Sequence, residues 1–405
     1  MLRVSRTLCN KLAPSSFFET LTRHNINTFY GVPDSLLKDF CAYVTDHVSP
    51  SHHIITANEG AAVGMAAGHY IATGKVSAVY LQNSGFGNII NPILSLTHRE
   101  VYNIPVLLLI GWRGQPGVHD EPQHVAQGRL MKELLRASEI PFSVLGPSVM
   151  NCASEVEMMV GAAVDHFNEK KTPYALLIER DTFSPYKLVN VGEEVGESLT
   201  RESALSIILD AVGAQDVVVS TTGMPSREVF ELREKKKQGH HQDFLTVGCM
   251  GHCSSIAAGI ALSHRGRKVY CLDGDGAAIM HLGTMPVLGN ISQQSKLLGN
   301  LKHIVINNGA HDSVGGQPTA AASRLGFLTD TALSFGYVTP TKAPVRTREE
   351  LVAAMQKLKE SEELSFLEVA VKKGSRKDLG RPTGTPVQNK EELMMFLQSP
   401  TTSHI

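Results

Sequence analysis

Short apolar runs alternate with Ala- and Gly-rich stretches along the whole chain. Gly, Asn and Pro bound the runs, as they bound buried strands, while the stretches between them have the pattern of helices. This alternation is typical of parallel sheets flanked by helices and therefore predicts an α/β fold. The predicted strands are 28–30, 53–56, 76–81, 106–110, 175–178, 217–221, 244–247, 268–272, 303–306 and 366–371.

The chain is long enough for two domains. Its 405 residues, 42% of them hydrophobic, can bury two ordinary cores or one unusually large one. A segment that begins at Gly64 aligns with one that begins at Ser255, each reading as a helix, a basic turn, a strand and a Gly-containing loop. The alignment favours two related domains, although chance similarity between α/β units is the alternative. The polar segment 189–198 reads as a linker. We expect domains at 14–188 and 199–380, a tail or presequence at 1–13 and a C-terminal tail at 381–405.

Charge and composition exclude several classes of partner. A formal net charge of −1 and a pI near 7.0 provide no field that would attract nucleic acid or an acidic membrane surface. No apolar run approaches the roughly 20 residues of a membrane span. The six cysteines form no CxxC pair, which suits a reducing compartment, and the lone CxxxC of Cys249 and Cys253 favours packing over metal binding.

The first residues leave the location of the protein open. Arg3, Arg6 and Lys11 lie among hydroxyl and apolar residues, and the first acidic residue is Glu19. This composition is that of a mitochondrial presequence, and a short disordered tail is the alternative. The mitochondrial matrix and the cytoplasm therefore both remain possible locations.

Two predicted strand ends carry candidate ligands for a metal and a diphosphate. Strand 268–272 runs into Asp275 and strand 303–306 runs into Asn308 and Ala310, and such ends meet at one edge of a parallel sheet. A carboxylate, an amide oxygen and a backbone carbonyl suit Mg²⁺, which takes its remaining oxygens from phosphate and water. Glycines let the backbone approach phosphate, and N–H groups at a helix start can bind it. The corresponding candidates are Gly274, Gly276 and Ala277. Gly-Asp-Gly alone is also ordinary turn chemistry.

Together with the Asn-Asn pair, this motif resembles the signature of thiamine-diphosphate enzymes. The resemblance implies that Glu59 contacts the aminopyrimidine of the cofactor and promotes loss of the thiazolium proton. It also implies a carbonyl contact from Gly248, an apolar wedge from Met250 and a diphosphate contact from Thr222. Each has an ordinary alternative: charge complementarity at a helix start for Glu59, core packing for Met250, and a common strand-end residue for Thr222.

Three longer strings narrow the resemblance. FYGVPDSLLKDF from Phe29, LLIGWRGQPGVHDEPQH from Leu108 and NNGAHDSVGGQPT from Asn307 resemble the phosphonopyruvate decarboxylase family, with the sulfopyruvate decarboxylases as nearest relatives. The resemblance covers about 14–380. It implies two related thiamine-diphosphate-binding domains, each a mostly parallel sheet flanked by helices. The first would bind the pyrimidine and the second the diphosphate and Mg²⁺, with no middle domain between them.

The implied reaction is the decarboxylation of 3-phosphonopyruvate to phosphonoacetaldehyde and carbon dioxide. An anionic 2-oxo acid needs cationic or hydrogen-bond donor groups that are not used by the cofactor. Asp34 is our candidate for proton handling and His311 for a further catalytic role. Asp34 and Ser35 read alternatively as a helix cap, and His119 and His124 as loop residues or mutual partners. The substrate candidates are Ser35, Arg113, His119, Gln123, His124, Ser313 and Gln317.

Two further expectations concern spacing and assembly. The chain between Asp275 and Asn308 is longer than is usual in the family, and we predict that the polar stretch 289–299 extends a surface connection without displacing the Asn308 strand. Glu59 and Asp275 lie in different predicted domains, so the cofactor would span a domain interface, which in the family lies between two subunits. A homodimer or larger symmetric assembly is thus implied.

Other functions use the same residues. Another 2-oxo acid decarboxylase, a carboligase or a 2-oxo acid dehydrogenase component would keep the cofactor ligands, although no flavin domain or lipoyl-docking region is recognisable. A non-catalytic interaction protein with a thiamine fold would typically have lost Glu59, Asp275 or Asn308, and all three are present.

Overall fold

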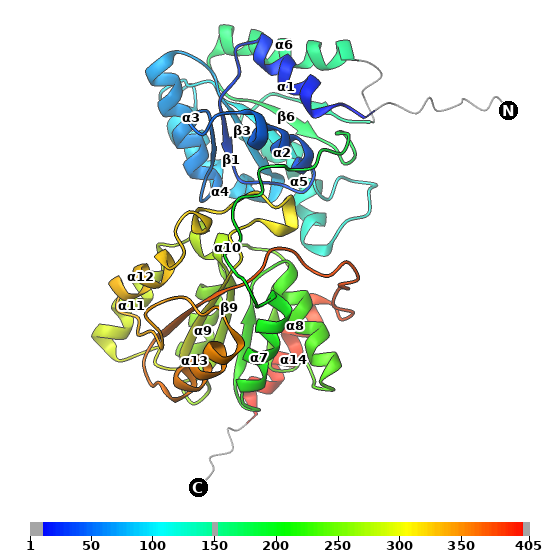
Figure 1. Ribbon diagram of the computed structural model, residues 1–405. Helices are drawn as coiled ribbons and strands as arrows, with labels where there is room; N and C mark the ends of the chain where they lie inside the picture. Colours follow the sequence, from blue (N-terminus) through cyan, green and yellow to red (C-terminus); the bar gives the residue numbers. More distant parts are fainter. Residues whose placement is uncertain (1–10, 148–152, 400–405) are drawn as a thin grey trace, which may run out of the picture. The chain divides into compact units, whose positions relative to one another are not determined.

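The computed structural model describes residues 11–147 and 153–399 (Figure 1). The expected tail or presequence at 1–13 lies almost entirely outside the described residues. The chain divides into two compact units, the first ending at Val191 and the second beginning at Gly192. No helix in the described ranges combines the length and the apolar character needed to cross a membrane.

The first unit contains one sheet whose neighbouring strands are all parallel. The strand order is β2-β1-β3-β4-β6-β5. Its elements are α1 (Pro14–Arg23), β1 (Phe29–Gly31), α2 (Lys38–His47), β2 (His53–Ile55), α3 (Glu59–Thr73), β3 (Ala78–Gln82), the short η1 (Asn83–Gly85), α4 (Phe86–Pro92), η2 (Ile93–Thr97), β4 (Leu107–Gly111), α5 (Pro122–Ala137), β5 (Phe142–Leu145), α6 (Ala153–Lys170) and β6 (Tyr174–Ile178).

Helices cover both faces of this first sheet. Alternate strand residues point to opposite faces, so that Tyr80 packs with α1, α2 and α6, while Val79 and Leu81 pack with α3, α4 and α5. Figure 1 shows α1 and α6 side by side on one face. The first unit is therefore a three-layer α/β domain.

The second unit repeats this plan with a sheet of order β11-β10-β9-β7-β8, again all parallel. Its elements are α7 (Arg201–Ala211), β7 (Val217–Ser220), α8 (Met224–Lys235), β8 (Asp243–Leu245), α9 (Cys253–Ser263), β9 (Val269–Gly274), α10 (Asp275–Met280), α11 (Thr284–Ser295), β10 (Leu301–Asn307), η3 (Asp312–Val314), η4 (Ala320–Ala322), α12 (Phe327–Ser334), α13 (Arg348–Glu360), β11 (Ser365–Ala370) and α14 (Pro386–Gln398).

Helices also enclose the second sheet. Helices α7, α8 and α13 cover the face that carries Tyr270 and Leu272, and α9, α11, α12 and α14 cover the face that carries Val269 and Cys271. The two parallel three-layer units confirm the predicted fold class. All ten predicted strands are present within a few residues, and β5 is an additional strand that the sequence pattern did not predict.

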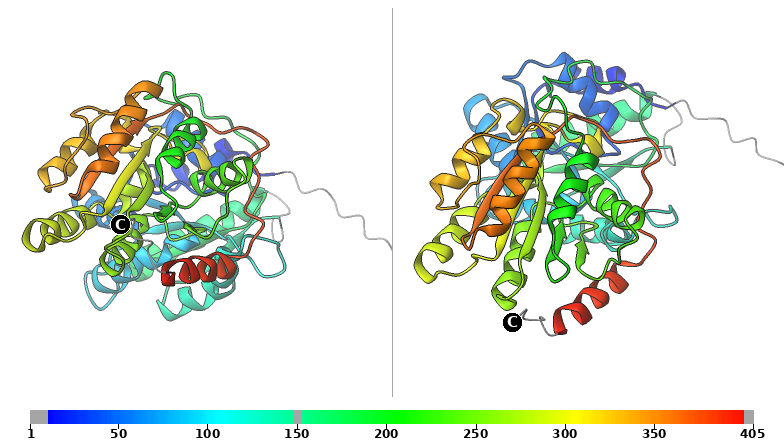
Figure 2. Two further views of the ribbon diagram at one scale, coloured as in Figure 1. Left: turned by 90° about the horizontal axis from the view of Figure 1, so that it is seen from below. Right: turned by 60° about the horizontal axis from the view of Figure 1, so that its bottom comes forward.

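Helix α14 lies in the segment that we expected to be a tail. Leu393 is buried in the second core, and Asn389 accepts from the Leu245 N–H at 3.0 Å and donates to the Asp243 carbonyl at 2.8 Å. The helix thereby covers the sheet edge formed by β8 (Figure 2). This part of 381–405 is an ordered helix and not a tail.

The long connection between Asp275 and Asn308 lies on the surface. Stretch 289–299 forms the end of α11 and a turn in which Lys296 and Leu298 have positive φ angles. The residues from 293 to 296 are all exposed, whereas Gly289 and Leu298 are buried. Strand β10 still pairs with β9 over six residues, from Leu301 to Ile306. The long connection is thus compatible with a β10 strand that is in register with β9.

Candidate active site

The candidate residues follow strands at the carboxyl ends of the two sheets. Because all strands in a sheet run parallel, these ends share one edge. In the first unit, Asp34 follows β1, Glu59 follows β2 and Arg113 follows β4. In the second unit, Asp275 follows β9 and Asn308 follows β10.

Glu59 is a buried carboxylate at the start of α3. Its helix is capped by the Asn58 side chain, which accepts from the Ala61 N–H at 2.9 Å. Glu59 is 5% exposed, and its Oε2 accepts from Asn88 Nδ2 at 2.7 Å. Burial raises the pKa of Glu59 above its ordinary value. The site therefore favours a carboxyl group that holds a proton more readily than it would in water.

Gly85 leaves the space that Glu59 occupies. A methyl group at Gly85 would lie 2.1 Å from Glu59 Oε1, far inside a normal contact distance. The φ of Gly85 is −76°, which any residue can adopt, so the constraint is on space and not on backbone conformation. Sequence reasoning missed both Gly85 and Asn88, which follow β3 in the same way that Glu59 follows β2.

Asp34 has one satisfied and one unsatisfied oxygen. Its Oδ2 accepts from the N–H groups of Leu36 at 2.8 Å and Leu37 at 3.1 Å, the cap-like pattern that was one of the two interpretations. Its Oδ1 is buried and has no hydrogen-bond partner among the described residues. Burial raises the pKa of Asp34 to about 6, although these N–H groups and Arg113 oppose the shift. Asp34 is thus suited to carry a proton on Oδ1.

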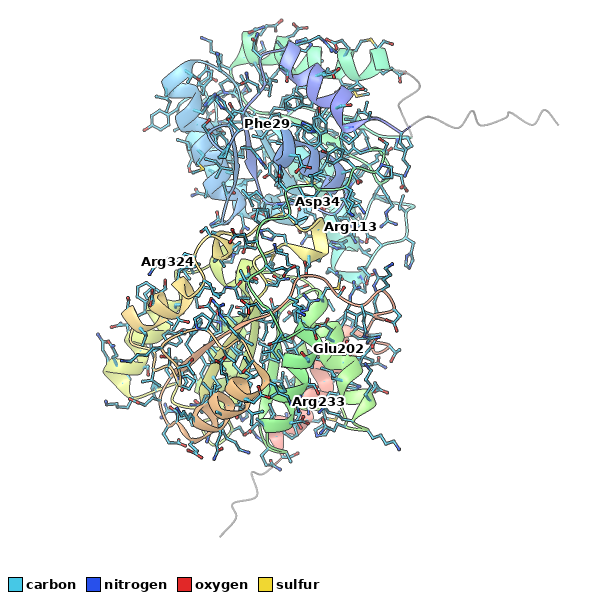
Figure 3. All side chains as sticks on the ribbon, viewed as in Figure 1. Phe29, Asp34, Arg113, Glu202, Arg233 and Arg324 are labelled. Atoms are coloured by element: carbon cyan, nitrogen blue, oxygen red, sulfur yellow. The ribbon has the colours of Figure 1, made fainter. Side chains whose placement is uncertain are left out.

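Arg113 is held by a carboxylate that the sequence did not single out. Figure 3 shows Arg113 close to Asp34. Its Nε donates to Asp120 Oδ2 at 2.8 Å, Nη2 donates to Asp120 Oδ1, and Nη1 donates to Ser35 Oγ at 2.7 Å. Although burial opposes the shift, hydrogen bonds from Arg113 and from two backbone N–H groups lower the pKa of Asp120 below its usual range. The charge of Arg113 is therefore largely matched by Asp120.

A second guanidinium reaches the same carboxylate. Arg180 follows β6, and its Nη2 lies 3.4 Å from Asp120 Oδ2. Its Nη1 donates to the carbonyl of His119 at 3.2 Å. The Arg180 side chain is 42% exposed, whereas Asp120 is only 4% exposed. Two guanidinium groups thus share one buried carboxylate, and the charges of Asp34 and Glu121 also act on Arg113. Arg180 could have been recognised from the sequence as a candidate, because it comes just after a predicted strand.

The other candidates of this string differ in environment. His119 is exposed, in agreement with its loop interpretation. His124 is 7% exposed, and burial together with the charge of Arg113 lowers its pKa to about 4, so the ring is neutral at pH 7. Gln123 Oε1 and His124 Nδ1 are buried and lack partners within the described chain. Buried polar atoms of this kind are costly unless a ligand or water satisfies them.

In the second unit, Asp275 and Asn308 lie against each other. Asp275 is 3% exposed, and its Oδ2 accepts from the Thr319 hydroxyl. Burial raises the pKa of Asp275 to about 6, while Thr319 and the N–H groups of Asn308 and Gly276 favour the ionised form. The carboxylate of Asp275 thus meets the backbone of Asn308. The long surface connection has not separated the two residues.

Asp312 fixes the Asn308 side chain. Asn308 Nδ2 donates to Asp312 Oδ2 at 2.6 Å, and Asn308 Oδ1 accepts from the Ala310 N–H at 3.1 Å. Asp312 Oδ2 also accepts from Arg201 Nη1 at 3.0 Å and from the Gly374 N–H at 2.9 Å. These bonds leave a second lone pair of Asn308 Oδ1 available to a cation. Sequence reasoning missed Asp312 and Thr319, although both lie in the string NNGAHDSVGGQPT.

The glycine loop is packed by His311. A methyl group at Gly276 would lie 2.9 Å from His311 Cε1, so only glycine fits there without movement of the ring. Burial lowers the pKa of His311 to about 4, which makes it a neutral donor or acceptor at pH 7. Gln317 is fully buried, and both of its side-chain amide atoms lack partners in the described part of the chain.

The remaining cofactor candidates lie along the same edge. Thr222 follows β7, and Gly248 and Met250 follow β8, the edge strand next to β7. The hydroxyl of Thr221, a residue not singled out from the sequence, is buried without a partner among the described residues. Two glycines lie close to these side chains. A Cβ atom added at Gly274 would lie 3.9 Å from the methyl carbon of Thr221, and a Cβ atom added at Gly223 would lie 4.0 Å from Ser313 Oγ. A free hydroxyl, a glycine loop and a paired carboxylate and amide fit a diphosphate with a divalent cation.

Both units match known protein domains. Residues 14–135 match the "Thiamine pyrophosphate enzyme, N-terminal TPP binding domain" and residues 221–369 match the "Thiamine pyrophosphate enzyme, C-terminal TPP binding domain". The fold and the site thus define a thiamine-diphosphate-binding enzyme. The chain belongs to the family of thiamine-dependent decarboxylases that includes the phosphonopyruvate decarboxylases, and it is a carboxy-lyase.

Three relatives illustrate the relationship. The chain is 30% identical to phosphonopyruvate decarboxylase of Streptomyces viridochromogenes, over 94% of each chain. It is 29% identical to phosphonopyruvate decarboxylase of Streptomyces hygroscopicus, over 96% of this chain and 95% of that one. It is 25% identical to sulfopyruvate decarboxylase of Methanosarcina acetivorans, over 88% and 90% respectively. The family resemblance inferred from the sequence motifs is confirmed.

Proposed function

We propose that this enzyme uses thiamine diphosphate and Mg²⁺ to convert 3-phosphonopyruvate into phosphonoacetaldehyde and carbon dioxide. The observation that carries the choice of substrate is the pair of guanidinium groups, Arg113 and Arg180, that share the single carboxylate of Asp120. Such a corner favours a tetrahedral anion with more than one charge. The similarity to two phosphonopyruvate decarboxylases over nearly their full length supports the same choice.

The second unit would hold the cation and the diphosphate. Asp275, Asn308 and the carbonyl of Ala310 offer the oxygen ligands that Mg²⁺ prefers. The N–H groups of Gly276 and Ala277, at the start of α10, and the hydroxyl of Thr222 would bind phosphate oxygens. Gly274 would allow a close backbone approach. In the proposal, Gly248 and Met250 contact the organic part of the cofactor.

The first unit would handle protons. When bound, the cofactor supplies the electron sink that a 2-oxo acid lacks as carbon dioxide leaves. Glu59 would hold a proton toward the aminopyrimidine, with Asn88 fixing one carboxylate oxygen. Asp34 Oδ1 would give a proton to the carbon that has lost carbon dioxide and would recover one from water. Ser35, His124 and Gln123 would line the substrate site as neutral donors, as would His311, Ser313 and Gln317 from the second unit, with His119 contributing from its exposed loop.

The substrate is tested by a side-by-side assay of aldehyde release from phosphonopyruvate, sulfopyruvate and pyruvate. A phosphonate tail carries more negative charge than a sulfonate near neutral pH, so we expect kcat/KM to be at least about tenfold higher for phosphonopyruvate. A preference for sulfopyruvate, in line with the Methanosarcina acetivorans relative, would replace the proposed substrate. Release from pyruvate alone would contradict a role for the arginine corner.

Cofactor and metal roles are tested separately. Removal of Mg²⁺ with a chelator should abolish turnover, and added Mg²⁺ should restore it. Glu59→Gln should strongly reduce turnover while thiamine diphosphate still binds in a calorimetric titration. Full activity of Glu59→Gln would exclude the assigned role of this residue.

We also propose that a functional site is built from two copies of the chain. The test mixes an inactive Glu59→Gln chain with an inactive Asp275→Ala chain. If each site takes Glu59 from one chain and Asp275 from the other, a heterodimer has one of its two sites with both residues intact. Random pairing should then restore about a quarter of wild-type activity. No recovery, in a mixture shown to have exchanged subunits, would place both residues of a site in one chain.

A further inference from the structure

A group of buried polar side chains lies on one face of the second sheet and has no part in the proposed reaction. Cys271 and Asp273 are alternate residues of β9 and point to the same face. His303 on β10 is the direct cross-strand partner of Cys271. Cys253 begins α9, which packs on this face. All four residues are at most 2% exposed.

The ligand atoms of Cys271, Asp273 and His303 are close enough to share one ion. The sulfur of Cys271, a carboxylate oxygen of Asp273 and a ring nitrogen of His303 all lie within 4.8 Å of one another. The sulfurs of Cys253 and Cys271 are 3.5 Å apart, and His303 Nε2 is 3.5 Å from Asp273 Oδ2. A tetrahedral Zn²⁺ ion, with bonds of about 2.3 Å to sulfur and about 2.0 Å to nitrogen or oxygen, separates its ligand atoms by roughly 3.4–3.8 Å. The two printed separations fit this geometry.

The polar atoms of the group are only partly satisfied by the protein: the two thiols and Asp273 Oδ1 have hydrogen-bond partners, and His303 Nε2 and Asp273 Oδ2 form an ion pair. Neither ring nitrogen of His303 nor Asp273 Oδ2 makes a hydrogen bond within the described residues. The surroundings are apolar, since Phe366 and Tyr337 flank the His303 ring at centroid distances of 5.4 and 6.4 Å. An unpaired buried polar atom is destabilising, and a bound cation would give both side chains a partner.

We propose that Cys271, Asp273 and His303 bind a borderline-soft divalent cation such as Zn²⁺, with Cys253, whose sulfur lies 3.5 Å from that of Cys271, as the fourth ligand. Two thiolates, a carboxylate and an imidazole match the ligand preferences of Zn²⁺ and not those of Mg²⁺, which favours oxygen. With all four positions filled by protein, the site has no open position for substrate and is structural. It would tie α9 to β9 and β10 just before the loop that carries Asp275.

The CxxxC pair of Cys249 and Cys253, which the sequence analysis assigned to packing, does not act as a pair in the proposed site. Cys249 is exposed and its sulfur lies 3.5 Å from His252 Nδ1, whereas Cys253 faces Cys271, which follows 18 residues later. The register of two strands and a helix brings the four residues together, and spacing along the chain carries no sign of it.

The proposed Zn²⁺ site is tested in the full-length protein. The protein is produced in medium that contains Zn²⁺ and dialysed against a chelator, and its metal content is measured by mass spectrometry. We expect about one Zn²⁺ per chain. Protein produced with Co²⁺ should show sulfur-to-cobalt charge-transfer absorption, which a metal held by Asp275 and Asn308 cannot give because those ligands are oxygens.

Variants of the proposed ligands test whether the bound Zn²⁺ lies at this site. Cys271→Ser and His303→Asn should lower the metal content at least about tenfold and abolish the charge-transfer absorption. Cys249→Ser, which removes an exposed thiol from the same unit, should retain both. If the first two variants do not fold, mercurial modification of the wild-type thiols should release the Zn²⁺ stoichiometrically.

Two results would overturn the proposal. Folded wild-type protein that holds less than about a tenth of an equivalent of Zn²⁺ and shows no sulfur-to-cobalt band would mean that the group is only a buried hydrogen-bonding cluster. Metal retained by Cys271→Ser, or lost by Cys249→Ser, would place the ion elsewhere. Neither result bears on decarboxylation, which the substrate assay tests independently.

Discussion

Replacing Gly85 by alanine tests whether Glu59 must occupy its observed position. The new Cβ would lie 2.1 Å from Glu59 Oε1, and ordinary contact begins near 3.4 Å. The carboxylate would have to move by about 1.3 Å, the difference between these distances, because the backbone of Gly85 is buried and belongs to the short helix η1. The movement would also strain the hydrogen bond from Asn88.

The size of the effect follows from the displacement. A misplacement of about 1 Å in a catalytic group typically costs about a hundredfold in rate, so kcat/KM should fall about a hundredfold, equivalent to about 2.7 kcal/mol of transition-state stabilisation. Folding should be little affected, because φ at Gly85 is ordinary and alanine costs less backbone entropy than glycine.

Gly87→Ala is the matched control. Gly87 is exposed, two residues further along, and a Cβ there would meet nothing within 4 Å. Both variants should be assayed at saturating thiamine diphosphate and Mg²⁺, with thermal unfolding in parallel. We expect wild-type kcat/KM for Gly87→Ala and near-wild-type unfolding temperatures for both. Activity of Gly85→Ala within threefold of the control, or a loss that tracks unfolding, would refute the argument.

Three further predictions concern other groups. Thr319→Val removes the hydroxyl that donates to Asp275 and should weaken Mg²⁺ activation about 10–100-fold; an unchanged Mg²⁺ titration of turnover would contradict this. Burial raises the pKa of Asp34 from its ordinary value to about 6, so the folded protein favours the protonated carboxyl group. The resulting stabilisation is present at low pH and is lost as the pH rises from about 4 through about 6. Urea unfolding should therefore show a wild-type loss of about 2–3 kcal/mol across this window that Asp34→Asn lacks, and equal pH slopes would count against it. Arg180→Gln should raise KM for phosphonopyruvate about tenfold while the exposed control Arg129→Gln has no effect, and equal KM values would exclude Arg180 from the substrate site.

The sequence pattern was sufficient for most of the fold, because buried parallel strands are apolar along their whole length. Strand β5 (Phe142–Leu145) escaped prediction for a physical reason. It lies at the edge of its sheet, and only Leu145 of its four residues is buried. An edge strand lacks the continuous apolar run that marks the central ones.

Helix α14 was missed for the opposite reason, since its local signal was present. Thr385 accepts from the Gln388 N–H and Gln388 returns the bond, and Pro386 occupies the first turn, a combination that marks a helix start. Its tertiary role could not have been foreseen from these residues. Arg267 is 2% exposed, its Nη2 donates to the carbonyls of Phe396 and Ser399 at 3.1 and 2.7 Å, and its guanidinium lies 4.4 Å from the centroid of the Phe396 ring.

Candidate residues at strand ends could be predicted because topology alone brings such ends to one edge. Their partners could not. Asn88, Asp120 and Asp312 are ordinary polar residues in sequence, and only the folded chain shows that they hold Glu59, Arg113 and Asn308. The sequence thus indicates which residues can do chemistry, and the tertiary structure determines their orientation and charge.

Charge is where the structure changes the interpretation most. Arg113, His124, His311 and Ser35 were among the residues expected to supply hydrogen-bond donors or positive charge to the substrate. His124 and His311 have pKa values lowered to about 4 by burial, so neither is a cation near pH 7, and Arg113 is already paired with Asp120. In the proposed function, recognition of an anionic tail by the first unit therefore depends on the second guanidinium, that of Arg180. Because Arg180 is partly exposed, salt should screen its contribution, and KM for phosphonopyruvate should rise with ionic strength more steeply in the wild type than in Arg180→Gln.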